Sequence, residues 1–423
     1  MAPRDYALLK QSMESKDQCD VVIVGAGAAG LMAAIWAGRT HPAKSIVLLD
    51  GAKKIGAKIL VAGGGRCNVT HHQVDPKRYA GSTKSAITKV LRRFDVPETK
   101  QFFSELGVDL KREETGKLFP TTDKARDVLN ALLTAAENAN IRLHNPCRVE
   151  AVGRTSTGFF VSGQWGRMEC KQLVLATGGK SLPKSGSDGK GFDFVRSLGH
   201  QVTRTLPALV PLTLPKKDPI CQLSGITLPT TLRLHSNTGK RILEFSDSTL
   251  CTHFGLSGPS VLDISRYFLD FKSKDPGAYL SIDWLPGKAK DELDADLQSL
   301  GHSSVRRYLR SCSLPERLVK MLIEYCSLEL DLLGDQLPRI GRRRLIQATT
   351  EMRLDITGNR GYTYAEVTAG GVPLNELVLQ RMESRCCPGL YLCGEVCDVD
   401  GPIGGFNFQW AWASGYVVGT SLG

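Results

Sequence analysis

Short apolar runs alternate along this chain with segments whose hydrophobic residues recur at helical spacing. Residues 20–24 (Asp-Val-Val-Ile-Val) and 45–50 (Ser-Ile-Val-Leu-Leu-Asp) are almost wholly apolar. Such runs are typical of strands buried on both faces of a parallel sheet. Between them lies a glycine-rich turn followed by Leu-Met-Ala-Ala-Ile-Trp-Ala, which predicts a helix. The pattern predicts a strand–helix–strand unit at the start of an α/β fold.

Later segments divide the rest of the chain. Residues 82–145 have mostly helical spacing, and within them the part from Ala125 to Ala139 predicts one helix. Strand-like runs at 172–176 and 389–393 each end in a glycine turn. From about 206 to 345, prolines and Thr- and Leu-rich runs predict a β-rich insert, with a helical portion at about 290–335. We therefore expect a discontinuous domain, with these boundaries: an N-terminal extension (1–19), a first part (20–205), the insert (206–345) and a second part (346–423).

The glycine turn has the spacing of a dinucleotide-binding fingerprint. Gly25, Gly27 and Gly30 form G-x-G-x-x-G between the first strand and its helix. These glycines allow a tight turn, a close approach to a pyrophosphate and close strand–helix packing. Asp50 ends the second strand twenty residues after Gly30, where a carboxylate can accept two ribose hydroxyls. Together these features predict that the chain binds an adenine dinucleotide.

Composition narrows the class of protein. With 423 residues, 42% hydrophobic and 23% charged, the chain is long enough for two or three folded domains. The first eighteen residues lack the apolar core of a secretory signal, and no apolar run is long enough to span a membrane. Twelve cysteines at irregular spacing, without a CxxC pair, favour reduced thiols over disulfides or zinc. We expect a cytoplasmic protein without a metal site.

The chain is basic, with 54 Lys and Arg against 43 Asp and Glu. Basic pairs and triplets recur, the longest being Arg342-Arg343-Arg344. Solvated surface charge that attracts phosphorylated cofactors explains this excess, and so does a polyanionic partner such as RNA. We expect Arg342-Arg343-Arg344 to contact phosphate if the partner is RNA. The charge does not exclude a small-molecule substrate.

Two features near the C-terminus favour FAD over NAD. The chain has a single complete fingerprint, whereas Gly394-Glu395 is a second strand–glycine–acid element whose carboxylate can bond a flavin ribityl chain. Gly404-Gly405 precedes an apolar helix, whose positive end would face the pyrimidine ring of a flavin and stabilise its anionic reduced form.

Several further motifs stand in the same order. They are Gly63-Gly64-Gly65-Arg66-Cys67-Asn68-Val69-Thr70, Gly116-Lys117-Leu118-Phe119-Pro120, Ala176-Thr177-Gly178-Gly179-Lys180-Ser181, Thr252-His253-Phe254-Gly255-Leu256-Ser257-Gly258-Pro259, Val367-Thr368-Ala369-Gly370-Gly371-Val372, and Gly405-Phe406-Asn407-Phe408-Gln409-Trp410. With the fingerprint, they resemble the bacterial BaiN/YhiN-type FAD-dependent oxidoreductases, a family also labelled aminoacetone oxidase. The similarity runs from about Asp20 to Gly419. Lys117 stands where the family often has Arg, and Ala62 where it often has Ser.

The resemblance implies a Rossmann-like FAD-binding domain interrupted by a β-barrel-like insert with a small helical portion. It also implies a reductase of activated C=C bonds, with NAD(P)H as transient donor. Family activities include enone reduction and uridine reduction in ribosomal RNA, so a small molecule and RNA both remain candidate substrates, as does oxidase chemistry. A flavin-containing RNA binder without catalysis is a further alternative.

The expected site residues follow from the motifs. We expect Thr177 and Gly178 near the adenosine half of FAD, and a strand through Val149 with its backbone against adenine. Cys67 is a candidate proton donor or a packed thiol, and His253 competes for that role or is structural. Arg66 is expected beside the chemistry, and Lys58 and Arg66 to steady phosphate or anionic flavin. The residues expected to hold FAD are Gly25, Ala26, Gly27, Ala29, Gly30, Asp50, Gly51, Lys58, Gly64, Gly65, Arg66, Asn68, Val149, Ala176, Thr177, Gly178, Gly179, Gly394, Glu395, Asp398, Gly405, Phe406 and Asn407.

Overall fold

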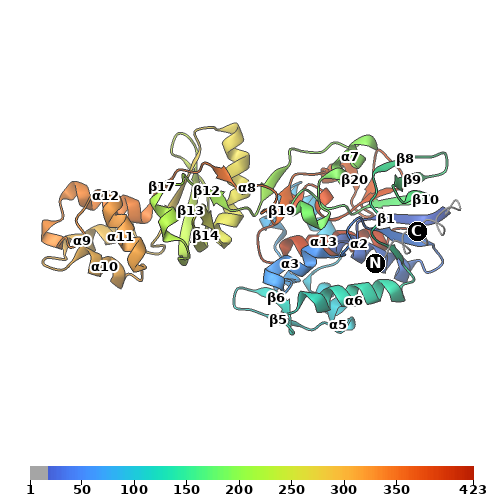
Figure 1. Ribbon diagram of the computed structural model, residues 1–423, viewed down its shortest axis with the longest axis horizontal. Coiled ribbons are helices and arrows are strands. Elements are labelled where there is room, and N and C mark those ends of the chain that lie inside the picture. Colours follow the sequence, from blue (N-terminus) through green and yellow to red (C-terminus); the bar gives the residue numbers. More distant parts are fainter. Residues whose placement is uncertain (1–17) are drawn as a thin grey trace. The chain divides into compact units, whose positions relative to one another are not determined.

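The computed structural model describes residues 18–423, and the expected N-terminal extension lies outside this range except for its last two residues. The described chain folds into two compact units (Figure 1). Of the described residues, the first unit contains 18–207 together with Glu366–Gly423, and the second contains Ala208–Ala365.

A parallel sheet organises the first unit. Its strand order is β20-β21-β22-β10-β1-β2-β7, and β1, β2, β7, β10 and β22 run parallel. In β1, β2 and β22 the residues at the carboxyl end are buried apolar side chains, as in parallel strands that are covered on both faces. Strands β8 and β9 form a hairpin, and β9 pairs antiparallel with the first half of β10 (Figure 1). The strands are β1 (Gln18–Val24), β2 (Ile46–Leu49), β7 (Arg142–His144), β8 (Ala151–Arg154), β9 (Phe159–Gly163), β10 (Gly166–Leu175), β20 (Leu377–Val378), β21 (Glu383–Ser384) and β22 (Leu390–Leu392).

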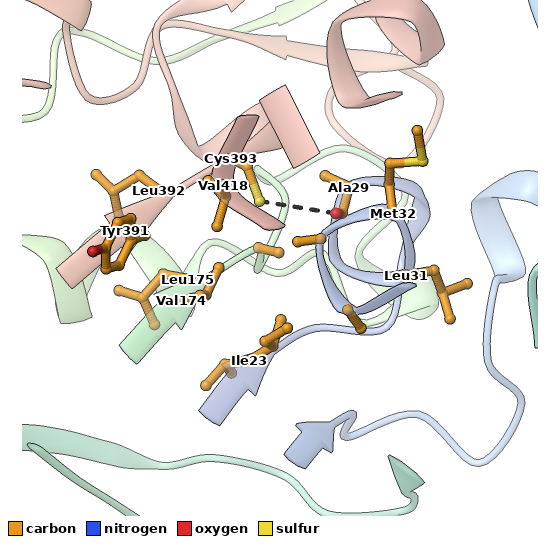
Figure 2. Close-up of a cluster of buried hydrophobic side chains, with 14 of the residues drawn as sticks. Ile23, Ala29, Leu31, Met32, Val174, Leu175, Tyr391, Leu392, Cys393 and Val418 are labelled. Atoms are coloured by element: carbon orange, nitrogen blue, oxygen red, sulfur yellow. Dashed lines mark hydrogen bonds between the residues drawn. The ribbon is translucent and has the colours of Figure 1, made fainter. Parts of the chain in front are cut away.

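Helices α2 (Ala28–Thr40) and α13 (Phe406–Gly419) pack closely on one another beside this sheet. A side-chain carbon added at Gly415 would lie 2.5 Å from the carbonyl oxygen of Ala29, so a larger residue would force the helices apart. Figure 2 shows Ile23, Val174 and Leu392 from three parallel strands close to side chains of both helices. The N-terminal ends of two helices are thereby held near the carboxyl ends of the strands, where α/β folds bind ligands.

The other elements of the first unit surround this centre. They are α3 (Ala57–Gly65), β3 (Thr70–His71), η1 (Pro76–Arg78), β4 (Ala80–Gly81), α4 (Lys84–Leu91), α5 (Val96–Glu105), β5 (Leu110–Arg112), β6 (Lys117–Pro120), α6 (Ala125–Asn138), η2 (Pro183–Ser185), α7 (Lys190–Ser197), β19 (Val367–Ala369), η5 (Leu374–Glu376), η6 (Gly394–Val396) and β23 (Val399–Asp400). The helix expected over Ala125–Ala139 is α6, and β5–β6 forms a hairpin within a segment expected to be mostly helical. Within residues 18–423, no helix is both long and apolar enough to cross a membrane.

The second unit combines an antiparallel sheet with a group of short helices (Figure 1). The strand order is β17-β16-β13-β14-β15-β12-β18, and α8 packs against β13 and β14. The elements are β12 (Leu212–Thr213), η3 (Pro219–Leu223), β13 (Thr227–His235), β14 (Arg241–Thr252), β15 (Gly255–Ser257), α8 (Pro259–Lys274), β16 (Tyr279–Asp283), α9 (Lys290–Gln298), α10 (Val305–Ser311), α11 (Glu316–Tyr325), η4 (Gly334–Gln336), α12 (Arg339–Thr350), β17 (Met352–Leu354) and β18 (Gly358–Asn359). Strand β11 (Leu206–Ala208) lies at the first crossing between the units.

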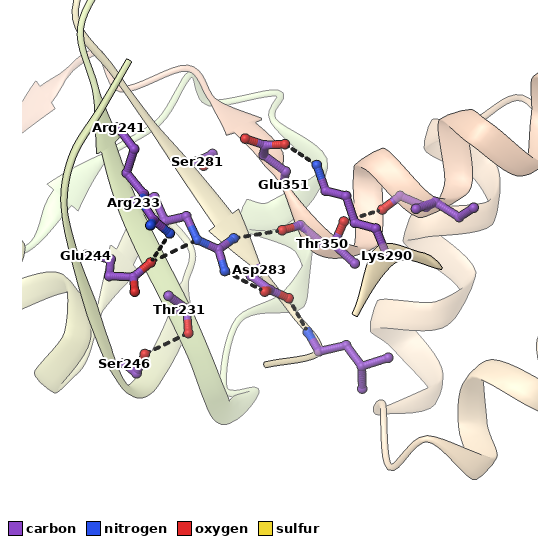
Figure 3. A network of polar contacts seen from close by, with 12 residues as sticks. Thr231, Arg233, Arg241, Glu244, Ser246, Ser281, Asp283, Lys290, Thr350 and Glu351 are labelled. Carbon is purple, nitrogen blue, oxygen red and sulfur yellow. Dashed lines mark hydrogen bonds and ion pairs between the residues drawn. The ribbon is translucent and has the colours of Figure 1, made fainter. Parts of the chain in front are cut away.

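The second unit extends to Ala365, whereas the sequence predicts a return to the first domain at 346. A polar network ties the intervening segment to the sheet (Figure 3). Arg233 on β13 donates to Asp283 Oδ2 at 3.0 Å and to the carbonyl oxygen of Thr350, the last residue of α12, at 3.0 Å. Strand β17 then pairs with β16, and β18 pairs with β12. These contacts place α12, β17 and β18 in the second unit.

Candidate functional site

The turn between β1 and α2 presents backbone N–H groups at the carboxyl end of the sheet. Gly25 has φ 104°, and a side-chain carbon there would lie 2.4 Å from the carbonyl oxygen of Ala176. At Gly30 an added carbon would lie 1.8 Å from the Gly25 oxygen, so both positions require glycine. Gly27, the N-cap of α2, differs, because no atom of residues 18–423 lies within 4 Å of a carbon added there and none of their side chains caps the helix. The first N–H groups of α2 are therefore available to a phosphate.

Asp50 directly follows β2 and is held by two backbone amides. Its Oδ2 accepts from Ala26 N at 2.7 Å, and its Oδ1 accepts from Ala52 N at 2.7 Å. Burial raises the pKa of Asp50, while these hydrogen bonds and the charge of Arg148 oppose the rise. Arg148 also pairs with Asp188 at 2.5 Å. The carboxylate is thus joined to the glycine turn, as a ribose-binding acid would be.

Val149 is buried, but it does not belong to a strand. It lies between β7 and β8, and the strand expected through it begins at Ala151. Pro146 has no N–H group, and Cys147 N donates to the carbonyl oxygen of Asp50 at 2.6 Å, so this segment has few donors for a ladder. The same contact brings Arg148, the residue before Val149, against Gly51, where an added carbon would lie 2.8 Å from Arg148 Cδ.

The turn after β10 lies beside the fingerprint. Ala176 N donates to the carbonyl oxygen of Val24 at 2.9 Å. Thr177 Oγ1 and Ser187 Oγ are buried, and neither has a hydrogen-bond partner within the described range, 18–423. A carbon on Gly178 would lie 2.6 Å from Ser187 Oγ, so the two hydroxyls flank this turn. Buried hydroxyls without partners are costly, and a polar ligand at this turn would be a suitable partner.

Glu395 is the centre of a polar network that spans four segments. Its Oε2 pairs with Lys58 Nζ at 2.5 Å, and its Oε1 accepts from Ser181 Oγ at 2.8 Å and from Thr368 N at 2.8 Å. Lys58 also donates to Ser181 Oγ at 2.8 Å. A side-chain carbon on Gly179 would lie 2.6 Å from Glu395 Oε1. Glycine at this position therefore permits the Glu395 carboxylate to approach the turn after β10. The two predicted cofactor residues Lys58 and Glu395 therefore bind each other.

The N-terminus of α13 is built around Gly405. This N-cap residue has φ 95°, and its own position offers no side chain to cap the helix. An added carbon there would lie 2.5 Å from the carbonyl carbon of Thr70. Asn407 exchanges two hydrogen bonds of 2.8 Å with the backbone of Gly401, and Phe406 is fully buried. The turn is thus held rigidly, and among residues 18–423 no side chain caps the N–H groups inside α13.

Asn68 supports the same turn, whereas Asp398 contacts the segment just before α4. Oriented to match its neighbours, the Asn68 amide accepts from Gly405 N at 3.1 Å and donates to the Thr70 oxygen at 2.9 Å. Asp398 is 8% exposed, and its backbone accepts from Ser82 N at 2.8 Å. Asn68 therefore acts on the protein turn, and the motif after α3 reaches the start of α13.

Cys67 is completely buried and has φ 61°, which is uncommon for a residue other than glycine. Burial raises the pKa of its thiol to about 12. Gly64 precedes it within a kink of α3 at Ala62–Gly64, and Gly65 ends that element. The thiol keeps its proton at neutral pH, as both a donor and a packed thiol would.

The Arg66 side chain contacts acidic and aromatic residues of the first unit. Its Nη1 pairs with Glu113 at 2.5 Å and lies 3.7 Å from Asp123, and its guanidinium stacks on Phe119 at 4.0 Å from the ring centroid. The other predicted catalytic residue, His253, belongs to the second unit. It is exposed in the turn between β14 and β15, edge-on to Phe254 at 5.1 Å.

A group of titratable side chains around the start of α13 was not predicted from the sequence. The His71 ring packs against Phe406 at 5.4 Å, and a carbon on Gly404 would lie 3.7 Å from Lys117 Cε. Burial lowers the pKa of His71. Burial also raises the pKa of Glu366, against the charges of Lys117 and Lys58. The signal was available, because His71 follows Asn68 closely and Lys117 lies in one of the motifs.

The fold and these two helix termini define a Rossmann-type dinucleotide-binding protein. Residues 19–421 match the family described as "HI0933-like protein Rossmann domain". The chain belongs to this family of FAD-dependent oxidoreductases, so the resemblance drawn from the motifs, the α/β Rossmann-type fold and the assignment as an enzyme are confirmed.

Curated relatives match nearly the whole chain. The "Ribosomal RNA dihydrouridine synthase" of Escherichia coli (strain K12) is 34% identical, covering 96% of this chain and 98% of that protein. The protein of the same name from Haemophilus influenzae is 33% identical, covering 95% and 98%. The "3-dehydro-bile acid delta(4,6)-reductase" of Clostridium scindens is 32% identical, covering 94% and 98%.

Proposed function

We propose that this protein reduces a uridine of ribosomal RNA to dihydrouridine, with NAD(P)H as the electron donor through FAD. The observation that carries the proposal is the near-full-length similarity to two proteins named ribosomal RNA dihydrouridine synthase. In the net reaction, uridine, NAD(P)H and a proton give dihydrouridine and NAD(P)⁺. One hydride and one proton add across the C5=C6 bond of uracil, which is conjugated to a carbonyl.

The residues present fit FAD. The N–H groups of α2 beside Gly27 would hold the pyrophosphate, and Asp50 would accept the adenosine ribose hydroxyls. The unpartnered hydroxyl of Thr177 fits the adenosine half. The start of α13 at Gly405 would face the flavin. When bound, FAD supplies the hydride.

Within the chain, Lys58 and Glu395 act as a pair. Because Glu395 Oε2 binds Lys58 Nζ at 2.5 Å, the carboxylate orients the ammonium as well as offering a lone pair to a ribityl hydroxyl. Lys58 would stabilise negative charge next to two turns, the one with Gly179 after β10 and the one with Gly394 after β22. This role does not require the pair to separate.

A proton must reach C5 of the base after hydride addition at C6. The Cys67 thiol, with a pKa raised to about 12, holds a proton at Sγ throughout the neutral range. It is our first candidate donor, and His253 and His71 are the alternatives. Arg66 is held by Glu113, so we assign it to positioning the loop that carries Cys67.

A small-molecule reductase is the second candidate function. The Clostridium scindens relative is named as a reductase of 3-dehydro-bile acids, and its similarity to this chain is of the same order. Reduction of an enone uses the same addition of hydride and proton. The two candidates differ in whether a polyanionic substrate must be bound.

Nucleoside mass spectrometry of ribosomal RNA from cells with and without this gene tests the proposal. We expect dihydrouridine at one or more positions to be lost without the gene and restored by the wild-type protein. The purified protein should be yellow, and NADH or NADPH should bleach its flavin spectrum. Identical dihydrouridine content in both strains would refute RNA reduction and leave small-molecule reduction.

A further inference from the structure

The positive charge of the chain is concentrated in one segment of the first unit. Residues 77–100 contain seven Lys and Arg and only two acidic residues. The second unit, residues 208–365, is close to balanced, with 21 Lys and Arg against 18 Asp and Glu. A polyanion would therefore be attracted to the surface formed by η1 and α4.

The two acidic residues of that segment, Asp95 and Glu98, cap the start of α5. Asp95 is the N-cap of α5 and accepts from Glu98 N at 3.2 Å, while Glu98 Oε2 accepts from Asp95 N at 2.6 Å. This reciprocal capping box commits both carboxylates to backbone amides. They are poorly placed to neutralise the lysines and arginines around them.

Five cations define a surface that we call the α4 basic face: Lys77, Arg78, Lys89, Arg92 and Arg93. All five are exposed, and none forms an ion pair with an acidic side chain of residues 18–423. Ile87 and Val90 are fully buried on the opposite side of α4, which packs against α13. Lys89, Arg92 and Arg93 therefore project from the outer side of the helix.

The α4 basic face adjoins the candidate flavin site within the first unit. The Arg78 guanidinium lies 4.7 Å from the ring centroid of Phe406, the first residue of α13. Strand β4, between η1 and α4, pairs with β23, just before the Gly404–Gly405 turn. A phosphate backbone bound along this face would pass beside the turn that faces the flavin.

The triplet expected to contact phosphate, Arg342-Arg343-Arg344, is a weaker candidate. Arg342 Nε donates to Asp294 Oδ1 at 2.8 Å, so one of the three charges is already paired. The neighbouring arginines Arg306 and Arg310 share Glu316. Only Arg343 and Arg344 of the triplet are exposed.

We propose that the α4 basic face docks the phosphate backbone of the RNA substrate and leads the target base to the start of α13. This inference rests on the proposed function, since it names the surface that the substrate would use. Bound phosphates release counterions, so each contact makes affinity depend on salt. A base must leave its stack to reach a flavin, so a backbone anchor next to the site would help hold the extruded nucleotide.

The test compares two triple variants of the full-length, FAD-loaded protein on a large-subunit ribosomal RNA transcript. The test variant is Lys89→Ala/Arg92→Ala/Arg93→Ala. The matched control is Arg339→Ala/Arg343→Ala/Arg344→Ala, which removes three exposed charges from α12. Counterion release predicts about fivefold weaker binding per lost contact at roughly 0.1 M salt, or about 100-fold for three. The slope of log K against log salt should fall by about 2.

Both variants should keep wild-type FAD content and bleach with NAD(P)H, which separates docking from folding. Equal RNA affinities and equal salt slopes for the test variant and the control would overturn the docking role of the α4 basic face. The same holds if the wild-type protein binds vesicles of phosphatidylserine and phosphatidylcholine but not the RNA transcript. If the gene proves dispensable for dihydrouridine while the test variant still loses RNA binding, the proposed reaction fails and the docking surface stands. If the test variant restores dihydrouridine as well as the wild type does, the docking surface fails alone.

Discussion

The two carboxylates predicted to hold FAD differ in how fully they are already bonded. Each Asp50 oxygen accepts one backbone N–H, which leaves lone pairs for ribose hydroxyls. Glu395 accepts from Ser181, Thr368 and Lys58, so it has less capacity left for a ligand. At the scale of single residues, Asp50 is therefore the stronger candidate for direct contact with FAD.

Replacing Asp50 should weaken FAD retention. We expect Asp50→Ala to reduce the binding free energy by about 1–3 kcal/mol, the scale of a lost hydrogen bond to a charged group. Equilibrium dialysis with flavin absorbance measures this. Asp20→Ala is the control, because Asp20 also accepts from a backbone amide, that of Ser45 at 2.9 Å, at the opposite end of β1. Unchanged FAD content in Asp50→Ala after dialysis would refute the assignment.

At the scale of elements, the glycines of one turn serve different purposes. Gly25 and Gly30 are required by neighbouring backbone, whereas a carbon at Gly27 meets no atom of the described residues within 4 Å. Gly27 also has φ −81° and ψ −170°, which any residue can adopt. A larger residue at Gly27 would therefore disturb a ligand at the N-terminus of α2 more than the fold.

This difference predicts opposite outcomes for two valine variants. Gly27→Val should fold, with the apoprotein losing no more than about 1 kcal/mol as a poorer N-cap, and FAD affinity should fall about tenfold or more because the side chain occupies the phosphate position. Gly25→Val should be strongly destabilised even without FAD. Thermal melting of the apoproteins and flavin titration measure both. Wild-type FAD affinity in a folded Gly27→Val would place the pyrophosphate elsewhere.

At the scale of the whole molecule, each of the two units contains buried thiols. Cys67 and Cys393 lie in the first unit and Cys251 in the second, and all three side chains are fully buried. Burial raises the pKa of each to about 12, from 9.0 for a free thiol. At a pH between 9.0 and about 12, the folded chain therefore keeps thiol protons that the unfolded chain loses.

Stability should therefore decrease as pH rises above 9. Each such thiol lowers the free energy of unfolding by about 1.4 kcal/mol per pH unit, because the unfolded state binds fewer protons than the folded state in this range. Denaturant titrations from pH 7 to pH 10 measure the decrease. Cys393→Ala should flatten it, whereas replacing the exposed Cys386 should not. A pH dependence identical in both variants would contradict this account of Cys393.

The apolar runs by themselves determined the α/β class, the strand–helix–strand start and the helix over residues 125–138, because burial on one or two faces leaves a local period in the sequence. The glycine spacing and Asp50 also predicted the dinucleotide turn, since backbone crowding there excludes larger residues. The hairpin of β5 and β6 and the true end of the insert were missed, because β17 is recognised only by its pairing with β16, about seventy residues earlier.

Only the tertiary structure decided which charges are paired. Lys58 meets Glu395 across more than three hundred residues, Arg66 meets Glu113, and Arg342 meets Asp294. In the sequence these residues look equally available, because charge has no local period that reveals its partner. Pairing depends on distances of a few ångströms between distant segments, and these distances exist only after the strands and helices have packed.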